Sequence, residues 1–365
     1  MKLGKLLTYA IYLALLGALG SATSAVCLGG PLSRPPVPAP DFTLGQCMNA
    51  DTLRLSEFRQ QPVLLFFCDA GQVSSIHAFP YVKEWHRRYQ VDGLQVLGIH
   101  CPSFEPLTIA HNAIEIISRG EIKFPIGMDM DRSVCAAYQI DTLPTYLLLE
   151  PGGTIAFESS QRKAYQKIEI AIQELLKGIN PDIVHPYLMK PVRPLDDPET
   201  RILPATPMMV IGWEDGLIQG VDSTTTGKYH VYSDTREKSR GRVYLQGKWK
   251  VDRFSIYHEQ LGGSSEDYIR LIYAGKDVWV LPFFEYGHQP RVYVRQDRTY
   301  LSRPAWGKDI TTDRTGKPYI FMRYSIPVHI VSNQVYGAHE LELIADRGAV
   351  SFYYVFFEDG VAEER

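Results

Sequence analysis

The chain has 365 residues, an apolar content of 45% and a net charge of −3, with 38 Lys and Arg against 41 Asp and Glu. This even balance of charge lacks the basic excess of a nucleic-acid-binding protein, and the apolar content is that of a folded protein rather than a disordered one. The length exceeds one typical core and predicts two domains.

The first 25 residues have the pattern of a secretory signal peptide. Lys2 and Lys5 precede the apolar stretch Leu6–Leu19, and Thr23-Ser24-Ala25 places small residues at a cleavage site. We therefore expect an exported protein, periplasmic or secreted, that is cleaved after residue 25 and has no transmembrane helix in its mature chain. The alternatives are an uncleaved membrane anchor and a lipid on Cys27.

Residues 39–178 alternate strands and helices. Val63–Phe67 is apolar without alternation and predicts a buried strand, and apolar residues at helical spacing predict a helix over Ser75–Tyr89. Further strands are predicted at Leu94–Ile99, Thr145–Leu149 and Thr154–Phe157, and further helices at Leu107–Ser118, Ser133–Tyr138 and Ala164–Lys177. The strand–helix–strand start predicts a parallel pair, and Gly152-Gly153 predicts an antiparallel hairpin at the end.

The chain changes character after residue 178. Residues 179–205 are rich in proline, show no period and are typical of a semi-rigid connector. Residues 206–360 contain many short stretches with strand character, separated by turn residues, and predict an all-β sandwich of the jelly-roll type. The expected strands are Tyr229–Tyr232, Val243–Leu245, Trp249–Ile256, Tyr268–Tyr273, Val278–Phe284, Val292–Arg295, Tyr319–Tyr324, Glu340–Ile344 and Val350–Phe357.

Four segments of the first half resemble the TlpA/ResA-like branch of the thioredoxin superfamily, which is related to the AhpC/TSA-like peroxiredoxins. They are "APDFTL" (Ala39–Leu44), the strand and helix around Val63–Pro80, "VLGIHCPSFE" (Val96–Glu105) and "IDTLPTYLLLEPGGTI" (Ile140–Ile155). The resemblance implies a thioredoxin-like α/β domain. It also implies that Pro144 is a cis-proline facing the turn in which this family carries Cys-x-x-Cys.

The second half is similar to the carbohydrate-binding-module-like C-terminal domain of DipZ-type proteins. The matching segments are "TPMMVIGW" (Thr206–Trp213), "RLIYAGKDVWVL" (Arg270–Leu281) and "GAHELELIADRGAVSFYYVFF" (Gly337–Phe357). Together the two resemblances cover roughly residues 39–358, and they leave out the membrane region of that family.

The nucleophile of this family is missing from the expected turn. Its chemistry needs a thiolate at a helix N-terminus, but the corresponding positions here are Gln72-Val73-Ser74-Ser75. The Thr-x-x-Cys of peroxiredoxins would also fall on Gln72 and Ser75. A serine hydroxyl does not replace a thiolate without an adjacent base, and His77, two residues along the helix, does not face Ser75.

Five cysteines remain: Cys27, Cys47, Cys68, Cys101 and Cys135. None has Cys-x-x-Cys or zinc-site spacing. Cys68 and Cys101 each follow a strand, and in the resembling fold these strands are neighbours. The two residues are therefore either a displaced, redox-active disulfide or two buried thiols, with buried thiols the favoured interpretation. We expect Cys47 and Cys135 to be packed and without function.

Other candidate site residues have simpler explanations. We expect a structural hydrogen bond for His100, and a solvated loop rather than a metal site for Asp129 and Asp131. Flat exposed aromatic rings stack on sugars, and Trp306, in a long loop, is the tryptophan of the second half that we expect to be exposed.

The leading hypothesis is an exported thioredoxin-like protein with a degenerate, redox-inactive site that binds a protein or peptide. It uses no cofactor or metal. One alternative is a thiol–disulfide oxidoreductase working through Cys68 and Cys101. The other is a carbohydrate-binding envelope protein that acts through the β-sandwich.

Overall fold

The computed structural model of the chain describes residues 37–222, 224–235, 238–260, 266–285 and 289–362. The expected signal peptide and Cys27 lie outside these residues. No helix in the described ranges is both long enough and apolar enough to cross a membrane.

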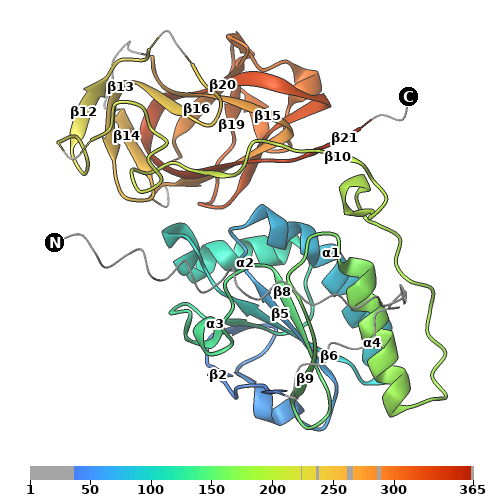
Figure 1. The fold of residues 1–365 in the computed structure, drawn as a ribbon. Coiled ribbons are helices and arrows are strands. Elements are labelled where there is room, and N and C mark those ends of the chain that lie inside the picture. Colours follow the sequence, from blue (N-terminus) through green and yellow to red (C-terminus); the bar gives the residue numbers. More distant parts are fainter. Residues whose placement is uncertain (1–36, 223, 236–237, 261–265, 286–288, 363–365) are drawn as a thin grey trace, which may run out of the picture. The chain divides into compact units, whose positions relative to one another are not determined.

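The first region is built on a seven-stranded sheet with the order β1-β9-β8-β5-β6-β7-β3 (Figure 1). Its strands are β1 (Val37–Pro38), β3 (Cys47–Met48), β5 (Val63–Cys68), β6 (Gln95–His100), β7 (Ile126–Met128), β8 (Thr145–Leu149) and β9 (Thr154–Ser159). β5 and β6 are parallel, and β8 and β9 form an antiparallel hairpin, as the sequence predicts.

Alternating side chains of β5 separate two cores. Leu64, Phe66 and Cys68 belong to one core, whereas Leu65 and Phe67 belong to the other, because successive strand residues point to opposite faces. The first core is covered by α1 (Val73–Tyr89), α2 (Ala110–Arg119) and α4 (Tyr165–Ile179), and the second by α3 (Ser133–Ala137). The sheet therefore has two faces with separate packing.

The chain between α4 and the second region is fastened to the first region by hydrogen bonds. The backbone N–H of Val192 donates to the hydroxyl of Tyr81 at 2.6 Å, and that of Met189 donates to the Glu169 carboxylate at 2.7 Å. Its side chains are nevertheless mostly exposed, and Tyr187 is 98% exposed. A short strand in it, β10 (Ile202–Leu203), pairs with β21 (Gly360–Val361) near the C-terminus.

The second region is all-β, as expected, and its main strands form one hydrogen-bonded network. They are β11 (Met209–Val210), β12 (Tyr229–Tyr232), β13 (Val243–Val251), β14 (Ile256–Gln260), β15 (Asp267–Phe283), β16 (Arg291–Gln296), β17 (Thr299–Tyr300), β18 (Ile310–Thr312), β19 (Pro318–Ile320) and β20 (Val328–Phe357). The predicted strands Tyr268–Tyr273 and Val278–Phe284 are parts of one strand, β15. Likewise, Glu340–Ile344 and Val350–Phe357 both belong to β20. Conversely, the predicted strand Trp249–Ile256 is a hairpin of β13 and β14.

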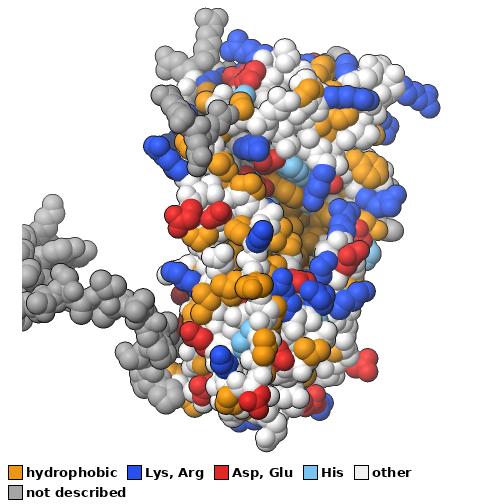
Figure 2. All heavy atoms as spheres, turned by 90° about the vertical axis from the view of Figure 1, so that its right-hand side faces the viewer, with side chains coloured by type: hydrophobic (Ala, Val, Ile, Leu, Met, Phe, Trp, Pro, Cys, Tyr) orange, Lys and Arg blue, Asp and Glu red, His pale blue; other side chains and the backbone are white. Residues whose placement is uncertain are grey.

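The surface carries both signs of charge. Figure 2 shows one face of the molecule, on which Lys and Arg side chains lie among acidic and hydrophobic ones. This mixture agrees with the near-even composition and gives no broad field of one sign on this face.

Candidate functional site

The turn between β5 and α1 places Gln72 and Ser75 at the start of the helix. The Gln72 side chain donates a hydrogen bond from Nε2 to Ser103 Oγ at 3.0 Å. Ser75 is fully buried, and its Oγ accepts a hydrogen bond from the Asp69 backbone N–H at 3.1 Å. Both side chains therefore act as hydrogen-bonding groups that shape the turn.

His77 is not a partner of Ser75. Its Nε2 lies 3.3 Å from the Glu358 carboxylate, and its Nδ1 accepts a hydrogen bond from Arg193. Arg193 also donates to the second oxygen of Glu358 at 3.0 Å. These contacts confirm that His77 faces away from Ser75 along the helix.

Asp69 and His100 are buried and organise the same edge of the sheet. Asp69 accepts hydrogen bonds from the N–H of Gly71 at 2.7 Å and of Ser103 at 2.8 Å. His100 Nδ1 accepts from the Ala70 N–H, so Nε2 is the donor to the Leu107 carbonyl; both distances are 3.2 Å. Burial lowers the pKa of His100 and favours this neutral form. The expected hydrogen bond of His100 is confirmed, whereas Asp69 was not among the candidate residues of the sequence.

Pro144 is the last residue of the loop before β8. Its peptide bond with Leu143 is cis, as the resemblance implied. The Ser74 hydroxyl donates to the Leu143 carbonyl at 3.4 Å, which places this loop beside the turn. Asp141 and Thr142, which precede Leu143, are exposed. The loop therefore presents polar side chains to solvent next to the start of α1.

A residue of the second region also reaches the turn. The Tyr354 hydroxyl donates to the Gly71 carbonyl at 2.6 Å, and Tyr354 is fully buried. The carbonyl oxygen of Gly71, the residue before Gln72, therefore already accepts a hydrogen bond from Tyr354.

The cysteine pairing differs from the expectation. Cys101 forms a disulfide with Cys135, and the two described cysteines without a partner are Cys68 and Cys47. Cys68 lies opposite His100 in the β5–β6 register, so the next residue, Cys101, points to the other face of the sheet. Cys135 of α3 lies on that second face. The alternative of a Cys68–Cys101 disulfide is therefore wrong. The favoured interpretation of two buried thiols is confirmed for Cys68 but is wrong for Cys101. Cys135 is packed, as expected, but its disulfide was not foreseen.

The free thiol of Cys68 is unreactive by environment. It is fully buried, and burial together with the neighbouring Asp69 charge raises its pKa far above the usual range. Because the thiolate is the nucleophile, Cys68 has almost none of the reactive form at neutral pH.

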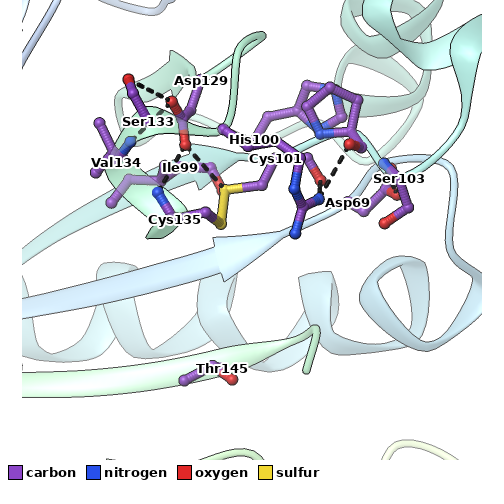
Figure 3. Close-up of a disulfide and its surroundings, with 12 residues drawn as sticks. Asp69, Ile99, His100, Cys101, Ser103, Asp129, Ser133, Val134, Cys135 and Thr145 are labelled. Atoms are coloured by element: carbon purple, nitrogen blue, oxygen red, sulfur yellow. Dashed lines mark hydrogen bonds between the residues drawn. A yellow bond between two sulfur atoms is a disulfide. The ribbon is translucent and has the colours of Figure 1, made fainter. Parts of the chain in front are cut away.

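Asp129 is the polar centre of the disulfide's surroundings (Figure 3). Its carboxylate accepts hydrogen bonds from the N–H of Val134 at 3.1 Å and of Cys135 at 2.8 Å, and one oxygen lies 3.5 Å from Cys101 Sγ. Asp129 is 1% exposed, so its placement in a solvated loop was wrong. Asp131, by contrast, is largely exposed.

Cys101, Asp129 and Cys135 also form the one cluster of three potential metal ligands found among the described residues, with ligand atoms within 4.8 Å of one another. The disulfide removes both thiolates, so in this redox state the cluster offers only a carboxylate. The sulfurs are also enclosed, since Cys101 is fully buried and Cys135 is 1% exposed.

Trp306 is not the exposed ring that the sequence suggested. Its indole N–H donates to the Leu301 carbonyl at 2.8 Å, and its ring packs against the core of the second region beneath Arg303. Trp213 is 40% exposed instead.

Comparison with known proteins places the first region in context. Residues 36–158 match the model of the AhpC/TSA family. DipZ proteins of Mycobacterium bovis and Mycobacterium tuberculosis are 22% identical over 231 residues, which is 62% of this chain and 32% of DipZ. The chain thus spans about a third of the length of these relatives.

Two further matches concern the first region. The thiol-disulfide oxidoreductase ResA of Bacillus subtilis is 29% identical over 117 residues, 32% of this chain and 62% of ResA. The crystal structure of a putative thiol:disulfide interchange protein DsbE from Chlorobium tepidum aligns with a TM-score of 0.35 and 19% identity, covering 38% of this chain and 95% of that one.

Proposed function

We propose that the chain acts, after export, as a redox-inactive module that binds an extended peptide or protein segment. The proposal starts from residues 36–158, which match the AhpC/TSA family model, and from the similarity of the chain to DipZ and ResA. The observation that carries the proposal is the start of α1. The two positions that would hold cysteines are Gln72 and a buried Ser75 whose hydroxyl is engaged by the Asp69 backbone.

The state of the sulfurs supports the inactive half of this proposal. Cys68 is buried with a raised pKa, and the Cys101–Cys135 disulfide is enclosed in the second core. An attacking thiolate has to reach a sulfur atom before exchange begins. Neither site meets this requirement in the folded protein.

The loop Asp141–Pro144 supports the binding half. Its exposed residues, Asp141 and Thr142, lie just before the start of β8 and beside the start of α1. An exposed segment next to a strand is a place where an extended chain can add by main-chain pairing. Such main-chain pairing does not depend on cysteine. The loop therefore keeps a means of binding after the nucleophile is lost.

The inactive half is tested by assays of insulin reduction and peroxide consumption on the full chain. We expect no turnover. Turnover that Cys135→Ser abolishes would overturn the proposal and assign the activity to the disulfide. A Gln72→Cys/Ser75→Cys variant serves as a positive control, compared with and without Tyr354→Phe, because Tyr354 occupies the Gly71 carbonyl.

The binding half is tested with S-carboxymethylated insulin B chain, an extended peptide that cannot form disulfides. We expect saturable binding that Thr142→Arg weakens and that Ser160→Arg, at another exposed position of the same domain, leaves unchanged. Equal binding by the two variants, or no binding, would contradict the assignment of the loop as the binding surface.

A further inference from the structure

An open hollow of about 390 Å³ lies between the start of α2 and the end of β15. Four of its lining residues are apolar or aromatic: Ile109 before α2, Phe283 and Phe284 at the end of β15, and Tyr324 before β20. Small-molecule sites have such side chains in their walls, have volumes of roughly 300–1,000 Å³ and are common between domains. The hollow meets these conditions, because α2 belongs to the thioredoxin-like region and β15 to the all-β region.

The walls of the hollow are packed in place. Phe283 and Tyr324 pack against the first core of the thioredoxin-like region, and Phe284 is 6% exposed within the core of the all-β region. The ring centroid of His111, in the first turn of α2, lies 5.2 Å from that of Tyr324. A cavity that exists before binding loses little conformational entropy when a ligand enters.

Two uncharged polar side chains also line the hollow, and both bind to the protein itself. Asn112 is 6% exposed and donates from Nδ2 to the Pro106 carbonyl at 2.7 Å. The Ser325 hydroxyl accepts from the Phe284 N–H at 3.1 Å and donates to the Phe284 carbonyl at 3.3 Å. These bonds join the segments that form the walls.

The three remaining lining residues carry ionisable side chains: His111, Glu285 and Arg323. His111 and Glu285 already have partners within the chain. The Arg323 guanidinium is exposed and forms no hydrogen bond or ion pair with any described residue; its Cζ lies 6.0 Å from the centre of the Phe321 ring. Because a guanidinium stays charged at ordinary pH, the hollow has one unpaired cation at its rim. The first turn of α2 adds the partial positive charge of a helix N-terminus.

We propose that this hollow binds a medium-chain fatty acid. Its apolar chain packs on Phe283, Phe284 and Tyr324, and each methylene removed from water adds to the affinity. Its carboxylate accepts hydrogen bonds from Arg323, whose planar donors match two carboxylate oxygens. Glu285 in the same lining repels further negative charge, so a single carboxylate is favoured over a polyanion.

This site goes beyond the proposed function and is independent of it, since peptide binding was assigned to residues 141–144 and none of these lines the hollow. The competing explanation is a crevice that the packing of the two regions leaves to water. Such a crevice would not distinguish a fatty acid from molecules that have the same chain and another head group. A series of head groups on one chain therefore separates the two explanations.

The test uses isothermal titration calorimetry on the full chain with octanoate, octanol, octyltrimethylammonium and butyrate as probes. We expect saturable binding of octanoate that is tighter than that of the other three. Arg323→Gln should weaken octanoate about tenfold, equivalent to about 1.4 kcal/mol, and leave octanol unchanged. Glu285→Gln should not weaken octanoate, because it removes a negative charge from the lining. Ile109→Ser, which shortens the apolar wall, should weaken both octanoate and octanol.

Two variants serve as controls and should leave octanoate binding unchanged. Arg314→Gln replaces another exposed arginine of the all-β region, which does not line the hollow. Thr142→Arg alters the loop assigned to peptide binding, so failure of that assignment and failure of this one are told apart. Far-UV circular dichroism of each variant checks that it is folded.

Three results would contradict the inference. The first is the absence of saturable octanoate binding up to millimolar concentration. The second is binding of octyltrimethylammonium or butyrate as tight as that of octanoate, because the site would then not recognise an anionic head or an apolar chain. The third is an equal effect of Arg323→Gln and Arg314→Gln, which would remove Arg323 from the site.

Discussion

The two faces of the thioredoxin-like sheet are closed by different chemistry. On the face that carries Cys68 and α1, the turn is held by hydrogen bonds and ion pairs among Ser75, Asp69, His77 and Glu358. On the opposite face, a disulfide and a buried carboxylate tie α3 to the end of β6. Cys101 directly follows His100 in the chain. The side chain of His100 therefore belongs to the first face, whereas that of Cys101 belongs to the face with the disulfide. The difference teaches that the disulfide joins α3 to the end of β6 on the second face, whereas the start of α1 on the first face carries no cysteine.

The largest expected effect comes from removing the covalent tie. Cys135→Ser should lower the free energy of unfolding by about 2–4 kcal/mol, because the disulfide closes a loop between residues 34 apart in sequence. Guanidinium unfolding of the variant, and of the native chain with and without reductant, measures this. Cys47→Ser is the control, since Cys47 is a free cysteine. An equal loss in both variants would mean that the disulfide contributes no special stability.

The next effect concerns the carboxylate on the same face. Asp129→Ala should cost about 1–3 kcal/mol, because it leaves the buried N–H groups of Val134 and Cys135 without their acceptor. Asp131→Ala should cost less, since Asp131 accepts from the Ser133 N–H at an exposed position. The comparison requires urea unfolding of the two variants under oxidising conditions. If Asp131→Ala proved the more costly of the two, the assigned role of Asp129 would be incorrect.

A smaller effect is expected on the polar face at acid pH. Burial by itself would raise the pKa of Glu358, but its hydrogen bond with His77 and the charge of Arg193 outweigh this and lower the pKa to about 2 from its ordinary value of 4.5. The unfolded chain takes up this proton near pH 4.5 and the folded chain only near pH 2. Its contribution to stability is therefore complete above pH 4.5 and is lost between those values.

Glu358→Gln should accordingly flatten the fall in the free energy of unfolding between pH 4.5 and 2. Glu84→Gln provides the control: the pKa of Glu84 is also lowered to about 2, mainly through Arg87, but this pair is more exposed and more screened by solvent. Chemical unfolding at a series of pH values measures both slopes. If Glu84→Gln flattened the fall in the free energy of unfolding more than Glu358→Gln did, the contacts of Glu358 would add little to stability.

The smallest expected signal is the reactivity of Cys47 and Cys68, the two free thiols among the described residues. In the native protein Cys47, which is partly exposed, should react with a thiol reagent faster than Cys68, which should react only on unfolding. Peptide mapping after timed alkylation assigns the labels. Rapid native labelling of Cys68 would show that the polar face opens readily, and it would weaken the contrast between the two faces.

Local patterns in the sequence determined the order of the elements and most of their ranges. Thr145–Leu149 was predicted as the strand that the structure contains, and the helix from Ser75 to Tyr89 extends by only two residues at its start. The sequence also shows that Gln72 and Ser75 stand where the resembling family has cysteines. The turn can be located because the strand before it and the helix after it are recognised from the periodicity of neighbouring residues.

Tertiary structure alone decided which distant residues meet. The partner of Cys101 depends on the face of β6 from which it points and on the packing of α3, and neither is encoded by the spacing of the cysteines. The burial of Asp129, the packing of Trp306 and the hollow between α2 and β15 likewise depend on contacts between separate elements. The physical reason is strand register: a shift of one residue exchanges the two faces of a strand, and register is set by long-range pairing rather than by local propensity.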